Sequence, residues 1–232
     1  MKVYIPLLIG FASLNAQTTS LPKNSPISVL SSIKTIETVD LNELTTFDPR
    51  WVDSLSLSLP CYEVPVPKRT MRLPNAPRNY RNGIHRGLDF FANWGTPVRS
   101  VAEGVVVRSD LHYEEVPADF RENLLKATTK VGHTPSDIFN SVLLGKSVFL
   151  DHGFDLIPGF RTISIYAHLS HIEKEIVPGA IVKRGELLGK SGNTGMREST
   201  IGSKAGSHLH WEMILQKGCL LYTSDAADDV LC

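Results

Sequence analysis

Three short segments of this chain alternate between apolar side chains and side chains that can bind a metal or transfer a proton, at residues 84–90, 163–168 and 208–213. Because alternate residues of a β-strand point to opposite faces of a sheet, each segment is predicted to be a strand with one apolar and one polar face. The polar faces carry His85 and Asp89, then Tyr166 and His168, then His208, His210 and Glu212. This pattern favours a mainly β fold that brings imidazole groups from separate strands to one place.

A half-exposed metal site on a sheet requires this arrangement, because imidazole and carboxylate groups are common metal ligands. Hydrogen-bonded surface histidines are the alternative for either histidine pair taken singly. The pair His85 and Asp89, the pair His208 and His210, and His168 together favour a shared site.

A second His-x-x-x-Asp spacing, His133 and Asp137, serves as a comparison within the chain. Here Thr134 has the character of a helix N-cap and Pro135 that of a first helical residue. We therefore interpret this pair as the start of a helix and not as a ligand pair.

Composition narrows the chemistry further. The 232 residues include 24 Lys and Arg against 24 Asp and Glu, which argues against a nucleic-acid or anionic-membrane partner held by bulk electrostatics. The three cysteines, at positions 61, 219 and 232, are too few and too scattered for a disulfide scaffold or a Cys-x-x-Cys metal site. Any metal would therefore be held by histidine and carboxylate groups.

The two ends of the chain differ from its body. Lys2 and the apolar run that follows it predict a secretory signal peptide over residues 1–16, too short to span a bilayer. Residues 17–60 are rich in Ser, Thr and Pro and are interpreted as a linker or pro-segment. Residues 218–232 continue neither a strand nor a helix pattern, and we expect this tail not to be authentic domain sequence. The working domain is predicted to span residues 61–217, and the mature protein to be exported to the periplasm or beyond the cell.

The body of the chain reads as short β-rich segments separated by glycine. Residues 96–107 and 177–189 share a similar pattern of short apolar runs around glycine, which predicts two related β-units packed together. Between them, apolar residues recur at helical spacing, so residues 111–145 are predicted to form a helical insertion that covers a groove edge.

Four motifs, taken in order along the chain, resemble the lysostaphin/LytM-type zinc metallopeptidases. They are His85-x-x-x-Asp89, Tyr166-Ala167-His168-Leu169-Ser170, Gly192-Asn193-Thr194-Gly195 and His208-Leu209-His210-Trp211-Glu212. The intervening Gly95-Thr96-Pro97-Val98 and Gly104-Val105-Val106 are also similar to that family. The resemblance covers residues 61–217. It implies a mainly β fold of the duplicated-hybrid-motif type, an antiparallel sheet or sandwich, and cleavage of peptides in bacterial peptidoglycan.

The resemblance also implies roles for individual residues. His85, Asp89 and His210 would be the ligands of Zn²⁺, and His168 and His208 would be catalytic without binding the metal. This agrees with general chemistry, because a catalytic zinc takes three protein ligands and keeps a fourth position open for water. His208 would act as general base and His168 would assist the tetrahedral intermediate or the leaving amine, although the two could exchange roles.

For three further residues the sequence allows two roles each. Glu212 could orient His210 or be a solvated carboxylate at a strand end. Tyr166 could contact substrate or be an ordinary strand tyrosine. Cys61 could cap the zinc in a latent form, although a plain buried cysteine is the stronger expectation.

Three functions compete. The first is a zinc endopeptidase that acts on peptidoglycan peptides, with no nucleic-acid partner, no stable membrane insertion after signal removal, and a monomeric state. The second is a catalytically inactive module of the same fold that binds cell wall or activates another hydrolase. The third is a biotinyl or lipoyl carrier domain, which the pattern at 177–189 also resembles. The five metal-binding and catalytic positions are all retained, which favours the enzyme.

Overall fold

The structure is a computed structural model that describes residues 50–53 and 55–216. The chain divides into two units, Met1–Asp40 and Leu41–Cys232, and all described residues belong to the second. The predicted signal peptide, the predicted tail at 218–232 and most of the predicted linker therefore lie outside the described residues. Within the described part, no helix combines the length and apolar character needed to cross a membrane.

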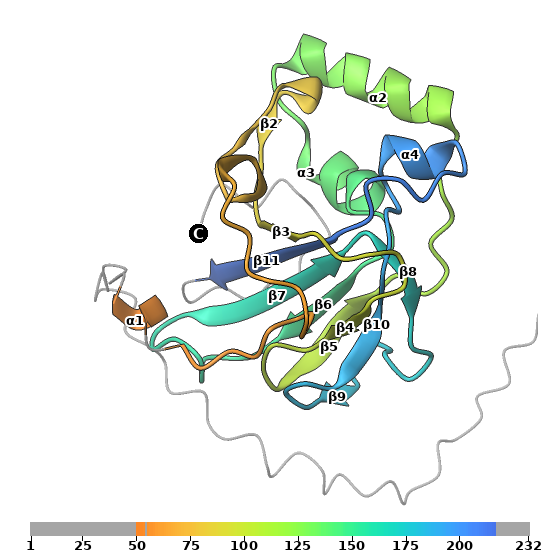
Figure 1. Cartoon of the computed structure of the whole chain (residues 1–232). Helices are drawn as coiled ribbons and strands as arrows, with labels where there is room; N and C mark the ends of the chain where they lie inside the picture. The colour runs from red at the N-terminus through yellow and green to blue at the C-terminus, as the bar shows by residue number, and fades with distance from the viewer. Residues whose placement is uncertain (1–49, 54, 217–232) are drawn as a thin grey trace, which may run out of the picture. The chain divides into compact units, whose positions relative to one another are not determined.

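Antiparallel sheets dominate the fold, as the sequence predicts (Figure 1). A six-stranded sheet has the order β3-β11-β7-β6-β5-β9, a three-stranded sheet the order β4-β10-β8, and β1 and β2 form a third, two-stranded sheet. The strands are β1 (Pro77–Arg78), β2 (Gly83–Ile84), β3 (Leu88–Phe90), β4 (Pro97–Arg99), β5 (Gly104–Ser109), β6 (Val148–Asp151), β7 (Arg161–Ala167), β8 (Leu169–Ile172), β9 (Ile181–Val182), β10 (Leu187–Ser191) and β11 (Leu209–Gln216).

The two predicted β-units, residues 96–107 and 177–189, pair with each other through two pairs of strands. β4 pairs with β10, and β5 pairs with β9, both antiparallel. The first unit contributes β4 and β5 and the second contributes β9 and β10. The prediction that the two β-units pack together is confirmed.

The predicted helical insertion is also confirmed. Its elements are α2 (Ala118–Val131), α3 (Ser136–Ile138) and the single π-helical turn η4 (Phe139–Leu143). The remaining helical elements are short: α1 (Arg50–Asp53), η2 (Thr70–Arg72), η3 (Asn79–Arg81) and α4 (Arg197–Thr200). The helix at the His133 and Asp137 spacing begins at Ser136, with Pro135 as its N-cap, and the Thr134 hydroxyl donates a hydrogen bond to the Arg81 carbonyl instead of capping the helix.

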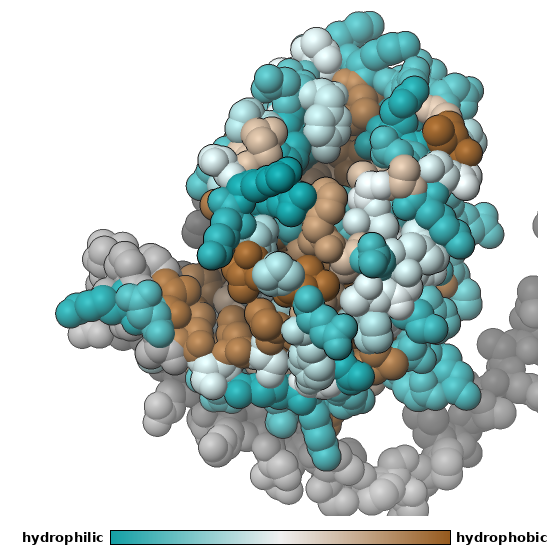
Figure 2. All heavy atoms as spheres, in the orientation of Figure 1, coloured by the Kyte–Doolittle hydropathy of each residue, from teal (hydrophilic) through white to brown (hydrophobic). Residues whose placement is uncertain are grey.

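Two apolar clusters pack on opposite faces of the six-stranded sheet. The main core joins this sheet to the three-stranded one and includes Tyr166, Leu209 and Leu188. A smaller cluster joins Ile165 and Ala167 of β7 to the insertion, through Phe139, Leu143 and Leu144. In Figure 1 α2 lies outermost with α3 below it, and Figure 2 shows mainly hydrophilic side chains over this outer part.

Candidate metal centre and active-site cleft

The paired strands β3 and β11 bring Asp89 and His210 together, and the loop before β3 adds His85, so the strand predicted over residues 84–90 is interrupted at residues 85–87. Asp89 and His210 are direct partners in the register of these antiparallel strands. His85 lies in the connection between β2 and β3, where its backbone N–H donates to the Ala76 carbonyl at 2.8 Å. Gly87 allows this connection to pass close to β11, since a Cβ atom there would lie 2.3 Å from the Trp211 carbonyl oxygen.

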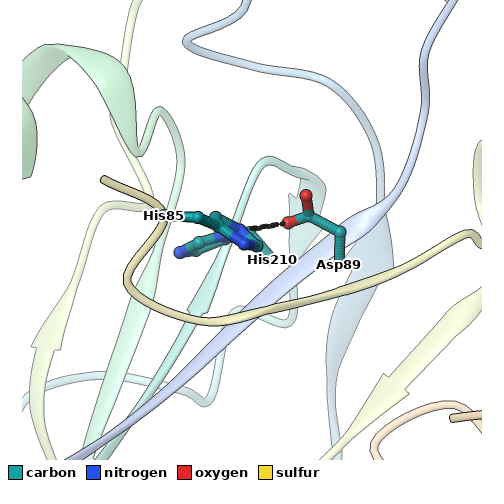
Figure 3. A group of neighbouring side chains, drawn as sticks. All are labelled: His85, Asp89 and His210. Carbon is teal, nitrogen blue, oxygen red and sulfur yellow. Dashed lines mark hydrogen bonds and ion pairs between the residues drawn. The ribbon is translucent and has the colours of Figure 1, made fainter. Parts of the chain in front are cut away.

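Three donor atoms of these residues converge on one point (Figure 3). Nε2 of His85 and Nδ1 of His210 are 3.0 Å apart, and Oδ1 of Asp89 is 2.9 Å from each. The three residues are buried, with exposures of 3%, 4% and 8%. Two ring nitrogens and one carboxylate oxygen in this arrangement form a donor set suited to a metal ion, and they are the only such group among the described residues.

Hydrogen bonds on the far side of each ring fix which nitrogen faces the centre. Nδ1 of His85 donates to the Leu73 carbonyl at 2.8 Å, which leaves Nε2 toward the centre. Nε2 of His210 donates to the Glu212 carboxylate at 2.7 Å, which leaves Nδ1 toward the centre. Of the two interpretations of Glu212, the structure therefore supports the one in which it orients His210, and Glu212 is itself buried.

The centre favours positive charge. Burial alone would raise the pKa of Asp89, but hydrogen bonds from His210 and His85 hold it well below its usual range. Burial alone would lower the pKa of His210, but the hydrogen bonds to Asp89 and Glu212 raise it to about 9. The two carboxylates that favour a proton on His210 would equally favour a metal cation in its place.

His168 and His208 lie beside this centre with their own backbone anchors. Nδ1 of His168 donates to the Thr194 carbonyl, and Nδ1 of His208 donates to the Gly206 carbonyl, both at 2.7 Å. The two ring centroids are 4.8 Å apart, and Nε2 of His208 is 3.5 Å from Oδ1 of Asp89. Burial lowers the pKa of both rings, so each is neutral near pH 7 with Nε2 able to accept a proton.

The position of His168 depends on its backbone. Its φ angle is 60°, in the left-handed region that residues with a side chain other than glycine seldom adopt. Regular alternation would place His168 on the same face as Tyr166, inside the main core. The left-handed turn at the end of β7 instead places the ring beside His208 and His210, with a centroid distance of 5.7 Å to His210.

Tyr166 does not share the face of His168, contrary to the sequence prediction. It is 0% exposed within the main core, and its hydroxyl accepts a hydrogen bond from the Val101 N–H at 2.9 Å. Ala167, the register partner of His210, lies on the metal-site face instead. The prediction failed because β7 is buried on both faces, so alternation of polarity did not mark its outer side.

Other sequence candidates lie away from the centre. Cys61 is a free, buried thiol of the main core, so the interpretation as a zinc cap is wrong and the plain buried cysteine is correct. His152 bridges the Glu103 carbonyl and the Ser164 hydroxyl at 2.6 and 2.7 Å. His112, His133 and His171 are exposed.

An aromatic stack that the sequence did not indicate supports His208. The Phe91 ring lies parallel to the His208 ring, with an interplanar angle of 15° and a centroid distance of 5.9 Å. The Arg72 guanidinium lies over the Phe91 ring, 3.5 Å from its centroid. Phe91 directly follows β3 and is 54% exposed. The sequence signal that could have identified it is a second phenylalanine directly after Phe90, on the face that strand alternation makes polar.

A cavity of about 270 Å³ opens over the centre. Its walls come from the β3–β11 strands, the loop around Gly195 and Gly206, and the helical insertion. Three arginines line it, Arg78, Arg81 and Arg121, against one acidic residue, Asp89. Arg78 also lies 3.2 Å from Oδ2 of Asp89, the oxygen that faces away from the histidines, and fixes the orientation of that carboxylate. The sequence prediction of a groove edge formed by the insertion agrees with this geometry.

Fold and site together define an antiparallel β protein with a candidate metal centre and two neutral histidines in one cleft. Residues 127–220 match the model of peptidase family M23. The resemblance to the lysostaphin/LytM-type peptidases is confirmed at the level of the family. His168, His208 and His210 lie within the matched residues, whereas His85 and Asp89 precede them.

Solved structures are similar to this chain at low identity. The catalytic domain of lysostaphin from Staphylococcus simulans is 20% identical over 75% of this chain and 90% of its own, with a TM-score of 0.37. A putative M23 peptidase from Pseudomonas aeruginosa is 27% identical over 72% of this chain and 52% of its own, with a TM-score of 0.36. A zinc-containing peptidase from Vibrio cholerae is 22% identical over 57% of this chain and 28% of its own, with a TM-score of 0.36. The chain thus spans about half or less of the Pseudomonas and Vibrio proteins. None of the curated proteins is similar enough to count as a match.

Proposed function

We propose that this protein is an exported zinc metalloendopeptidase that hydrolyses peptide cross-links of bacterial peptidoglycan. The observation that carries the proposal is the convergence of His85, Asp89 and His210 beside two neutral imidazoles in one cleft. The match of residues 127–220 to the model of peptidase family M23 and the motif resemblance support peptide hydrolysis. The apolar segment at residues 1–16 supports export.

The residues fit a catalytic zinc ion. Nε2 of His85, Oδ1 of Asp89 and Nδ1 of His210 would hold it, and three protein ligands of the nitrogen and oxygen type leave one position open for water, as catalytic zinc sites do. When bound, the ion would lower the pKa of water at the open position to about 7 and polarise the scissile carbonyl. Glu212 would hold the His210 ring in the ligating orientation by accepting a hydrogen bond from its Nε2–H group.

His208 and His168 would carry the proton transfers. Each ring has its Nδ1 proton committed to a backbone carbonyl, so Nε2 is the atom that can accept the proton of the attacking water. The resulting imidazolium can donate that proton to the nitrogen of the departing amine. His208 lies closer to the charged Asp89 carboxylate, which would stabilise the imidazolium, and this favours His208 as the base.

Digestion of intact sacculi and purified muropeptides tests the proposal. The full chain is assayed with bound zinc, after chelation, and after zinc is restored, and new amine termini are identified by mass spectrometry. We expect zinc-dependent appearance of defined amine termini. Bound zinc without cleavage of either substrate would favour the inactive cell-wall-binding or hydrolase-activating module of the same fold.

A further inference from the structure

Two arginines in the cleft wall are buried charges. Arg81 is 5% exposed and Arg121 is 8% exposed, and both line the cavity that contains the candidate metal centre. They come from separate elements, since Arg81 ends η3 and Arg121 belongs to α2 of the helical insertion. The two elements pack against each other, which brings both arginines to the same side of the cleft.

Neither arginine has a carboxylate partner within 4.0 Å in the part of the chain that the structure describes. Arg81 donates to the Ile84 carbonyl and lies 4.7 Å from the centroid of Phe139, and Arg121 donates through Nε to the Gly195 carbonyl at 3.0 Å. Glu115 contacts the same loop, but its two oxygens accept from the Gly195 N–H and the Tyr113 hydroxyl.

The contrast with other arginines is clear. Arg78, Arg108 and Arg161 each form an ion pair with an aspartate. A buried cation is unfavourable unless it is paired, and these two arginines, without a carboxylate partner among the described residues, leave unpaired positive charge at the cavity wall. Burial lowers the pKa of Arg81, a side-chain hydrogen bond with Tyr80 opposes this shift, and the neighbouring cations Arg86 and Arg78 act in the same direction as burial.

The wall is shaped to hold the Arg81 guanidinium in place. A Cβ atom at Gly83 would lie 2.5 Å from Nη1 of Arg81, so the absence of a side chain at Gly83 makes room for the charged group. Arg121 uses only Nε in its bond to Gly195, and its two terminal nitrogens have no hydrogen-bond acceptor within the described residues. Paired terminal N–H groups of arginine match the two oxygens of a carboxylate.

We propose that Arg81 and Arg121 bind a carboxylate of the peptide that is cleaved, so that this cleft selects peptides with a carboxylate beside the scissile bond over uncharged glycine bridges. The inference rests on the proposed function and adds the substrate class. The acceptor is a carboxylate that belongs to the peptide, because the arginines line the same cavity as the catalytic histidines.

The test compares two synthetic cross-link peptides that differ only in one group, a free carboxylate or its carboxamide. A hydrogen bond to a charged group is worth enough to change kcat/KM by about 10- to 100-fold, so the wild type should prefer the carboxylate peptide by that factor. Arg81→Gln and Arg121→Gln should each remove most of this preference, and Arg121→Lys should retain part of it. Arg99→Gln is the matched control, because Arg99 also donates to a backbone carbonyl, that of Gly185, but does not line the cavity.

A second pair of peptides with an N-methylated scissile amide measures binding without turnover, by calorimetry on the zinc-loaded protein. Tighter binding of the carboxylate form that depends on the arginines, with no cleavage of any peptide, would sustain carboxylate recognition by the two arginines and reject the proposed function. Equal cleavage of the carboxylate and carboxamide peptides by the wild type would reject this inference and sustain the proposed function. If one glutamine variant does not fold, the other variant and the wild-type peptide comparison still decide the outcome.

Discussion

Glu212 and His210 form a buried hydrogen bond of 2.7 Å between side chains on the same face of β11. The bond directs Nδ1 of His210 toward Asp89 and His85 and places a second negative charge behind the ring. It thereby links the strand alternation visible in the sequence to the donor geometry of the candidate metal centre.

Replacement of Glu212 by alanine should weaken zinc binding. Loss of a carboxylate that orients a metal-bound histidine lowers metal affinity by about 10- to 100-fold. Competition with a chelating indicator measures this change. Glu212→Gln, which can still accept a hydrogen bond, should give a smaller loss, and Glu122→Ala on the exposed side of α2 should give none. An unchanged affinity in Glu212→Ala would contradict the orienting role.

Removal of a donor atom should abolish the metal site. His85→Ala, Asp89→Ala and His210→Ala should each purify with little zinc, whereas the wild type should bind about one zinc per chain, because three protein ligands are the minimum that catalytic zinc sites use. Metal analysis of the dialysed proteins checks this. The control His133→Ala removes the histidine of the other His-x-x-x-Asp spacing and should retain zinc. Full retention of zinc in the donor variants would contradict the assignment of the metal ligands.

Alanine at His208 or His168 should separate metal binding from activity. Both variants should keep zinc, since neither ring belongs to the donor set, and each should lose about 10²- to 10⁴-fold in kcat because a proton-transfer group is missing. Parallel zinc analysis and cleavage assays test this. The larger loss should occur in the variant that lacks the general base. The short distance from His208 to Asp89 favours His208 as that base. Wild-type turnover in either variant would exclude that residue from proton transfer.

Phe91 should influence activity through His208 without touching the donor atoms. A parallel aromatic pair contributes about 0.5–1.5 kcal/mol, so Phe91→Ala should lower kcat by roughly 2- to 10-fold while zinc content stays constant. The pH profile of kcat should shift with it, and Phe91→Trp should restore both. Phe154→Ala, an exposed phenylalanine away from the cleft, is the control. A Phe91→Ala enzyme with the wild-type pH profile would show that the stack does not position His208.

His152 should make stability depend on pH. Burial lowers its pKa below the ordinary 6.5, so the unfolded chain binds a proton more readily than the folded one. Its contribution is therefore complete above about pH 6.5 and is lost progressively as the pH falls below that value. The free energy of unfolding, measured with chelator present, should fall less steeply over this range in His152→Gln than in the wild type, and His171→Gln should behave as the wild type. Identical slopes in wild type and His152→Gln would overturn this linkage.

The sequence by itself determined the faces of the neighbouring strands β3 and β11. In β3 and β11 one face is apolar and packs into the main core, so alternation correctly separated Phe90 and Leu209 from Asp89 and His210. The repeated glycine pattern likewise predicted two β-units packed together, and the structure pairs β4 with β10 and β5 with β9.

Only the tertiary structure decided the central strand and the walls of the cleft. The helical insertion covers the second face of the sheet, so β7 is buried on both sides and its alternation carries no information about which side faces the site. A left-handed backbone at His168 then reverses the side on which its ring lies. Arg81 and Arg121 reach one cavity because η3 packs against α2. The sequence of neither segment contains a periodic pattern that would predict this contact. Local periodicity determines which face of a strand is apolar, whereas long-range packing determines what lies against that face.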